Sequence, residues 1–133
     1  MRLKSCYFIF CLILFTACSA TQESGNESLY GTWNWIGSSG GIDGRTETPE
    51  TTGRTMALQF SKNVLKKYNN GNLIQELPFS IQVRESIIDG APRKMLIYEE
   101  QSKQSFNLSN DTLTLFDECY DCFVSRYIRS TNK

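Results

Sequence analysis

The sequence predicts an all-β fold, a small antiparallel up-and-down β-barrel of eight to nine strands that follows a signal peptide. Two observations predict it. After residue 29, apolar side chains recur at every second position in run after run, as expected for strands with one buried face. Turn-forming pairs separate these runs at spacings of about ten residues, which is typical of a β-meander.

The first 17 residues have the features of a signal peptide. Arg2 and Lys4 supply positive charge, and Cys6–Ala17 form an apolar run. A membrane-spanning helix needs roughly 20 residues, so this shorter run is better explained as a signal-peptide core. We therefore expect three segments: a signal peptide (1–17), a flexible tether (18–28) and a β-barrel domain (29–133).

Leu14–Cys18 (LFTAC), at the end of the apolar run, resembles the lipobox of bacterial lipoproteins. The resemblance implies cleavage before Cys18 and a lipid anchor on its thiol. The expected partner is then the membrane, and the expected location is the cell envelope. Ser19 does not resemble the Asp that retains such proteins in the inner membrane, which favours the outer membrane in a Gram-negative host. An ordinary secretory signal cut after Ala20 is the alternative.

The composition excludes several classes of function. The chain has 14 basic and 14 acidic residues, so it indicates no nucleic-acid-binding surface. It has no His, which excludes Ser–His–Asp triads, His-ligated metals and histidine acid–base chemistry. We therefore expect a protein that is not an enzyme and has no catalytic residues, metal or cofactor. Enzymes built on carboxylates, Tyr or Lys remain the open alternative.

The alternation also predicts which side chains fill the barrel. A barrel of eight strands is just wide enough to be filled by side chains or to hold one small ligand. The turn signals between strands are Asn70-Gly71, Asp89-Gly90 and Asn110-Asp111. The bulky residues expected to point inward are Met56, Leu58, Phe60, Phe79, Ile81, Val83 and Leu115.

Two short motifs near the ends of the domain carry a family resemblance. Gly31-Thr32-Trp33 resembles the opening of the first strand in lipocalins and their bacterial lipocalin-like relatives. Asp111–Leu115 and Tyr127-Ile128-Arg129 look like the closing hairpin of small lipocalin-like lipoproteins. The resemblance implies that Arg129 packs over Trp33 and closes one end of the barrel. Such a cation–π contact contributes about 0.5–2 kcal/mol.

The segment Gly37–Gly53 has no clear periodicity. Long irregular segments inside small domains tend to be functional or disordered. In lipocalins the first inter-strand loop covers the mouth of the cavity, so the resemblance implies a lid here. Its centre is Gly40-Gly41-Ile42-Asp43. The alternative is a mobile crossover that binds nothing.

Cys119 and Cys122 are the two thiols expected in the mature domain besides the lipidated one. A redox pair needs a thioredoxin-like setting and a zinc site needs four ligands, and the sequence indicates neither. We expect a disulfide across the last turn, or two reduced thiols. The neighbouring acids Asp117, Glu118 and Asp121 fit no known calcium loop and are expected to form a solvated turn.

Two functions remain. The first is non-catalytic binding of a small apolar or amphipathic ligand. The second is a cell-envelope protein-interaction or inhibitor module with a filled barrel. A cavity of at least about 300 Å³ favours the first, and a solid interior favours the second.

Overall fold

The computed structural model describes residues 29–99 and 102–131. In these ranges the chain is nearly all β-structure, as predicted. The elements are β1 (Gly31–Gly40), β2 (Arg45–Glu47), α2 (Pro49–Thr52), β3 (Met56–Ser61), β4 (Val64–Asn69), β5 (Asn72–Pro78), β6 (Ser80–Glu85), β7 (Pro92–Ile97), β8 (Lys103–Ser109), β9 (Thr112–Asp117) and β10 (Phe123–Arg129).

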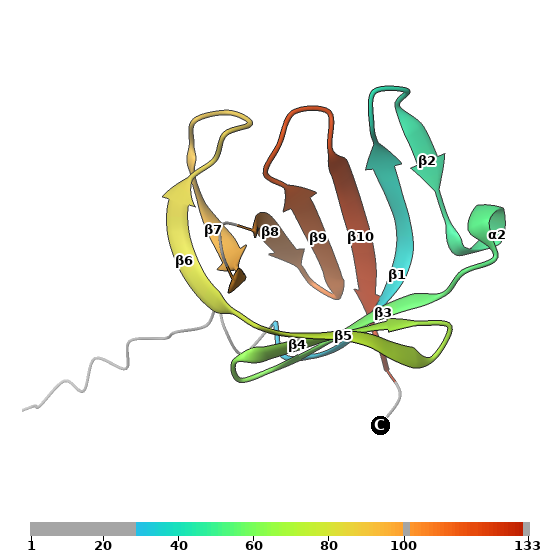
Figure 1. The fold of residues 1–133 in the computed structure, drawn as a ribbon. Coiled ribbons are helices and arrows are strands. Elements are labelled where there is room, and N and C mark those ends of the chain that lie inside the picture. Colours follow the sequence, from blue (N-terminus) through green and yellow to red (C-terminus); the bar gives the residue numbers. More distant parts are fainter. Residues whose placement is uncertain (1–28, 100–101, 132–133) are drawn as a thin grey trace, which may run out of the picture.

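The strands form one antiparallel sheet that curls into an incompletely closed barrel (Figure 1). The hydrogen-bonded path runs β5-β4-β3-β1-β10-β9-β8-β7-β6, and β2 pairs with β1 beside this path. β1 joins the two meanders because it pairs with both β3 and β10. The nine strands of the path confirm the predicted up-and-down fold and its strand number.

The barrel is open between β5 and β6, which form the two ends of the path. A single residue, Phe79, separates these strands, so the chain turns a corner there instead of forming a hairpin. In Figure 1, β5 crosses the lower part of the view and β6 climbs away from it. Val83 on β6 is 67% exposed. The prediction that Val83 is buried is wrong because no strand covers this edge of the sheet.

The other predicted inward side chains face a common core. Leu58, Phe60 and Leu115 are at most 5% exposed, and Met56, Phe79 and Ile81 pack around them. Each buried side chain of this size contributes about 1.5–3 kcal/mol, so the cluster is the main source of stability. Its buried members are Leu29, Trp33, Trp35, Leu58, Phe60, Leu65, Leu96, Tyr98, Phe106, Leu113, Leu115 and Tyr127.

Residues 37–53, expected to form an irregular loop, contain regular structure. β1 continues to Gly40, the chain turns over 41–44, and β2 returns along β1. The one-turn helix α2 follows, with Thr48 as its N-cap and Gly53 ending it at φ +65°. The prediction of a long irregular loop is therefore wrong. The small polar residues of this hairpin form strands without the apolar alternation that marks a strand in a sequence.

Candidate functional site

Trp33 and Arg129, the pair predicted to close one end of the barrel, are in contact. The Arg129 guanidinium lies 4.1 Å from the centre of the Trp33 ring. It also donates a hydrogen bond of 2.8 Å to the Tyr30 carbonyl. The Trp33 indole N–H donates to the Leu29 carbonyl, at 2.8 Å, and Trp33 is fully buried. These contacts cover the indole ring among the described residues.

A cleft opens where β1 and β3 separate. Their pairing ends at Asn34 opposite Ala57, and β1 then pairs with β2 instead. Trp35 and Met56 follow directly after this last pair and line the cleft, whose volume is about 470 Å³. The segment 37–53, which contains the end of β1, β2 and α2, runs from just past Trp35 to just before Thr55, so it connects the two walls of the cleft.

The cleft is lined by uncharged residues. Trp35 is held in place because its indole N–H donates to Ser38 Oγ, which is itself 2.7 Å from Ser125 Oγ. The Tyr68 hydroxyl donates a hydrogen bond to Gln59 Oε1 at 3.2 Å. Aromatic and aliphatic groups therefore stand beside neutral hydrogen-bonding groups. The lining residues are Thr32, Asn34, Trp35, Thr55, Met56, Ala57, Gln59, Tyr68 and Gly71.

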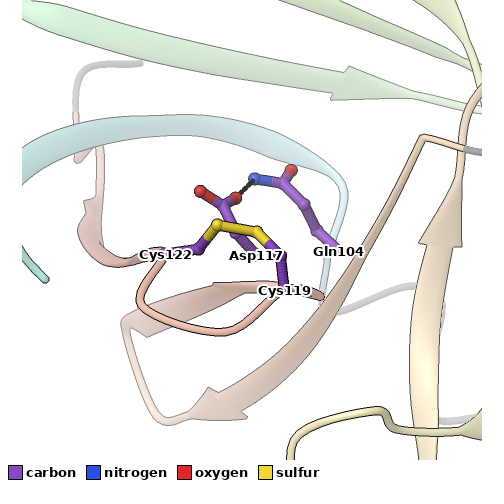
Figure 2. Close-up of a disulfide and its surroundings, with 4 residues drawn as sticks. All are labelled: Gln104, Asp117, Cys119 and Cys122. Atoms are coloured by element: carbon purple, nitrogen blue, oxygen red, sulfur yellow. Dashed lines mark hydrogen bonds between the residues drawn. A yellow bond between two sulfur atoms is a disulfide. The ribbon is translucent and has the colours of Figure 1, made fainter. Parts of the chain in front are cut away.

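A second hollow, here called the recess, has the opposite character. Its volume is about 320 Å³, and most of its lining is polar or charged. The Tyr98 hydroxyl donates a hydrogen bond to Gln104 Oε1 at 2.8 Å, and Gln104 Nε2 donates one to Asp117 Oδ1 at 2.6 Å. Figure 2 shows the Gln104–Asp117 contact beside the disulfide. The lining residues are Lys67, Tyr98, Ser102, Lys103, Gln104, Asp117, Glu118 and Cys119.

Lys67 reaches the recess from β4, where it pairs with Leu58 on the inner face. Its ammonium nitrogen lies 5.6 Å from the centre of the Tyr98 ring. Burial lowers the pKa of Lys67, and the Asp117 carboxylate opposes this shift. Burial also raises the pKa of Tyr98 and raises that of Tyr127 to about 12, so both phenols are neutral hydrogen-bonding groups at ordinary pH.

The four residues predicted to form a lid lie at the end of β1 and in the β1–β2 turn. Ile42 is 95% exposed at its tip. Gly40 is tightly packed, because a Cβ built there would lie 2.2 Å from the Cys122 carbonyl oxygen. None of Gly40, Gly41, Ile42 and Asp43 lines the cleft or the recess. The β1–β2 turn therefore packs against the end of β10 and is not part of either lining.

Cys119 and Cys122 are joined by a disulfide, with 5.6 Å between their Cα atoms (Figure 2). The bond closes the turn between β9 and β10, beside Asp117. Glu118 does not belong to a solvated turn: it is 9% exposed and accepts hydrogen bonds from Ser86 Oγ and the Ile87 N–H. The expectation of a fully solvated acidic turn is wrong because the β6–β7 loop covers Glu118.

Residues 29–99 and 102–131 contain no group of three or more Cys, Asp or Glu side chains placed to hold a metal ion. Within the same ranges, no helix is long and apolar enough to cross a membrane. The predicted lipid-anchor residue Cys18, the predicted signal peptide and the predicted tether lie outside the described residues.

No protein-family model, no curated protein and no solved structure matches this chain.

Sequence reasoning missed most residues of both hollows. A signal for Lys67 was present, because Leu65 is an inward residue and the period of two places Lys67 on the same face. Gln104 and Asp117 follow the same rule, because the period of two places them on the faces of Phe106 and Leu115. They are neighbours only because β8 and β9 pair in the register that sets them opposite each other.

Proposed function

We propose that the chain is a membrane-anchored, lipocalin-like binding protein without catalytic activity, and that the cleft between β1 and β3 takes a small, uncharged amphipathic ligand. The observation that carries this proposal is the composition of the cleft. It combines a volume of about 470 Å³ with a lining that has no charged side chain. Ligand pockets are typically about 300–1,000 Å³.

The uncharged lining sets the ligand class. A charged ligand would lose its hydration in the cleft without gaining an opposite charge, which is costly. An apolar surface would pack against Trp35, Met56 and Ala57. Neutral hydroxyl or amide groups on the ligand would find partners in Asn34 and Gln59. A molecule with one apolar face and a few neutral polar groups matches both the apolar and the neutral polar parts of the lining.

The proposal can be tested with N-phenyl-1-naphthylamine, an uncharged amphipathic probe whose fluorescence rises in apolar sites. We expect saturable binding with one probe per domain. Ala57→Phe places a ring in the cleft and should weaken binding at least about tenfold, the equivalent of about 1.4 kcal/mol. Gln82→Phe, on the exposed face of β6, is the matched control and should bind as the wild type does.

Equal binding by the wild type and both variants would locate the probe elsewhere and contradict the proposal. Absence of saturable binding by the folded wild type would contradict it as well.

The second candidate, a protein-interaction module, is favoured by the packed core and the unpaired edges of β5 and β6. Leu73, Ile74 and Val83 on these strands are at least 50% exposed. Exposed apolar edges are templates for pairing with another chain. If this face is the functional one, Ile74→Lys with Val83→Lys should abolish cross-linking to envelope proteins, whereas Ala57→Phe should leave it unchanged.

A further inference from the structure

The recess contains two charged side chains that are not neutralised by contact with one another. Its lining includes Lys67, Lys103, Asp117 and Glu118. Glu118 is already occupied, because Ser86 Oγ and the Ile87 N–H donate to its carboxylate at 2.9 to 3.1 Å. The positive charge of Lys103 stabilises the Glu118 carboxylate. The two remaining charged groups that line the recess are Lys67 on β4 and Asp117 on β9.

Lys67 is a partly buried cation that lies over the aromatic ring of Tyr98. Among the described residues, no carboxylate oxygen lies within 4.0 Å of its ammonium nitrogen, although the neighbouring Lys66 does form such a pair with Glu76, at 3.6 Å. The Tyr98 ring attracts the ammonium but accepts no strong hydrogen bond from it. The ammonium can therefore donate to a ligand.

Asp117 is held in a fixed orientation by hydrogen bonds. Gln104 donates to its Oδ1, and Tyr98 in turn donates to the Gln104 carbonyl oxygen. Each side chain in this series of hydrogen bonds orients the next, so the Asp117 carboxylate is held by a neutral donor, the Gln104 amide. No described residue donates to its other oxygen, Oδ2. A fixed carboxylate with a free oxygen is suited to an ammonium group.

We propose that the recess is a second binding site, distinct from the cleft, and that it takes a small zwitterion whose carboxylate pairs with Lys67 and whose ammonium pairs with Asp117. A ligand with only one charge would pair with one wall and leave the opposite charge desolvated beside it. A zwitterion pairs with both. Charge-assisted hydrogen bonds of this kind are about twice as strong as neutral ones.

The size of the recess limits the ligand. A water molecule takes up about 30 Å³ of the liquid, so a volume of about 320 Å³ has room for a ligand of roughly ten non-hydrogen atoms. Free amino acids and short ω-amino acids are within this limit, and lipids and oligopeptides are not. The distance between the two charges should then decide which member of a series binds best.

The test is calorimetric titration of the folded domain with glycine, β-alanine, 4-aminobutyrate, 5-aminovalerate and 6-aminohexanoate. We expect one chain length to bind best. The acid and the amine of matched length, each lacking the other charge, should bind at least about tenfold more weakly. Lys67→Met and Asp117→Asn should each reduce affinity for the best ligand at least about tenfold, whereas Lys66→Met, on the outer face of β4, should not.

The variants also separate binding from folding. Lys67→Met removes a partly buried charge and should unfold at the same or a higher temperature than the wild type, so a loss of binding would not reflect a loss of structure. Three results would overturn the proposal: no saturable binding of any ligand in the series, equal binding of the matched acid or amine, or an equal loss with Lys66→Met. Ala57→Phe in the cleft should leave this titration unchanged, so the two sites are tested independently.

Discussion

The Arg129 guanidinium lies 4.1 Å from the centre of the Trp33 indole, and the two residues come from opposite ends of the domain. They meet because β1 pairs with β10, with Trp33 directly opposite Arg129 in the register. Arg129 also approaches Asp111 in the β8–β9 turn, with 3.7 Å between Arg129 Nε and Asp111 Oδ1. The contacts of Arg129 therefore connect the first strand, the last strand and the β8–β9 turn.

We expect Arg129→Ala to destabilise the domain by about 1–3 kcal/mol. The variant loses the cation–π contact and a hydrogen bond from a charged donor to the Tyr30 carbonyl. Urea unfolding followed by tryptophan fluorescence measures the change. Arg126→Ala, at an exposed position of the same strand, is the control and should stay within about 0.5 kcal/mol of the wild type. Equal effects of the two variants would show that the contact contributes nothing specific.

Gly40 is expected to be the least replaceable glycine of the β1–β2 hairpin. A Cβ there would lie 2.2 Å from the Cys122 carbonyl oxygen, and φ is +142°, where other residues are strained. We expect Gly40→Ala to cost more than about 2 kcal/mol, or to prevent folding. Gly44→Ala is the matched control, because φ there is +62° but no atom lies within 4 Å of the added Cβ. If thermal melting shows that both variants lose the same stability, the close approach to Cys122 is not the cause of the loss in Gly40→Ala.

The sequence predicted those parts of the fold that depend on local alternation. The runs around Leu58 and Leu115 have one apolar face, and that face is buried in the structure. The opening between β5 and β6 left no such signal. It depends on the corner at Phe79 and on how far the sheet curls, which is a property of all the strands together.

The candidate sites were less accessible to sequence analysis than the fold. The cleft exists because β1 changes partner from β3 to β2 after Asn34, and only the pairing register shows this. The recess depends on Lys67 and Asp117, which come from strands far apart in the chain and line the same hollow. Polar residues at inward strand positions, such as Lys67 beside Leu65, are the sequence signal to look for.

The lipid anchor can be tested independently of the fold. We expect labelled palmitate to be incorporated into the wild type and to be absent from Cys18→Ala, because the thiol is the acylated group implied by the lipobox-like LFTAC sequence. Cys11→Ala is the matched control. Cys11 belongs to the segment expected to be removed, so its loss should leave labelling of the mature protein unchanged. Labelling that persists in Cys18→Ala would contradict the assignment.

Glu118 should make the stability of the domain depend on pH. Burial alone would raise the pKa of its carboxyl, but the nearby Ser105 hydroxyl and the donors from Ile87 and Ser86 hold that pKa below its usual value. The folded state therefore prefers the carboxylate form. The resulting stabilisation is complete above the pKa that Glu118 has in the unfolded chain. It is lost as the pH falls through the lower pKa that Glu118 has in the folded state.

Glu118→Gln keeps the shape of the side chain but removes the charge that accepts these hydrogen bonds. We expect it to destabilise the domain by about 1.5–3 kcal/mol near pH 7, the usual contribution of hydrogen bonds to a charged group. The difference from the wild type should shrink as the pH falls below the ordinary pKa of a glutamate, about 4.3, and through the lower pKa that Glu118 has in the folded state. Urea unfolding at a series of pH values measures it. Glu99→Gln, at an exposed position, is the control and should stay within about 0.5 kcal/mol of the wild type at pH 7. A gap between wild type and Glu118→Gln that stays constant with pH would mean that the carboxylate charge does not stabilise the β6–β7 loop.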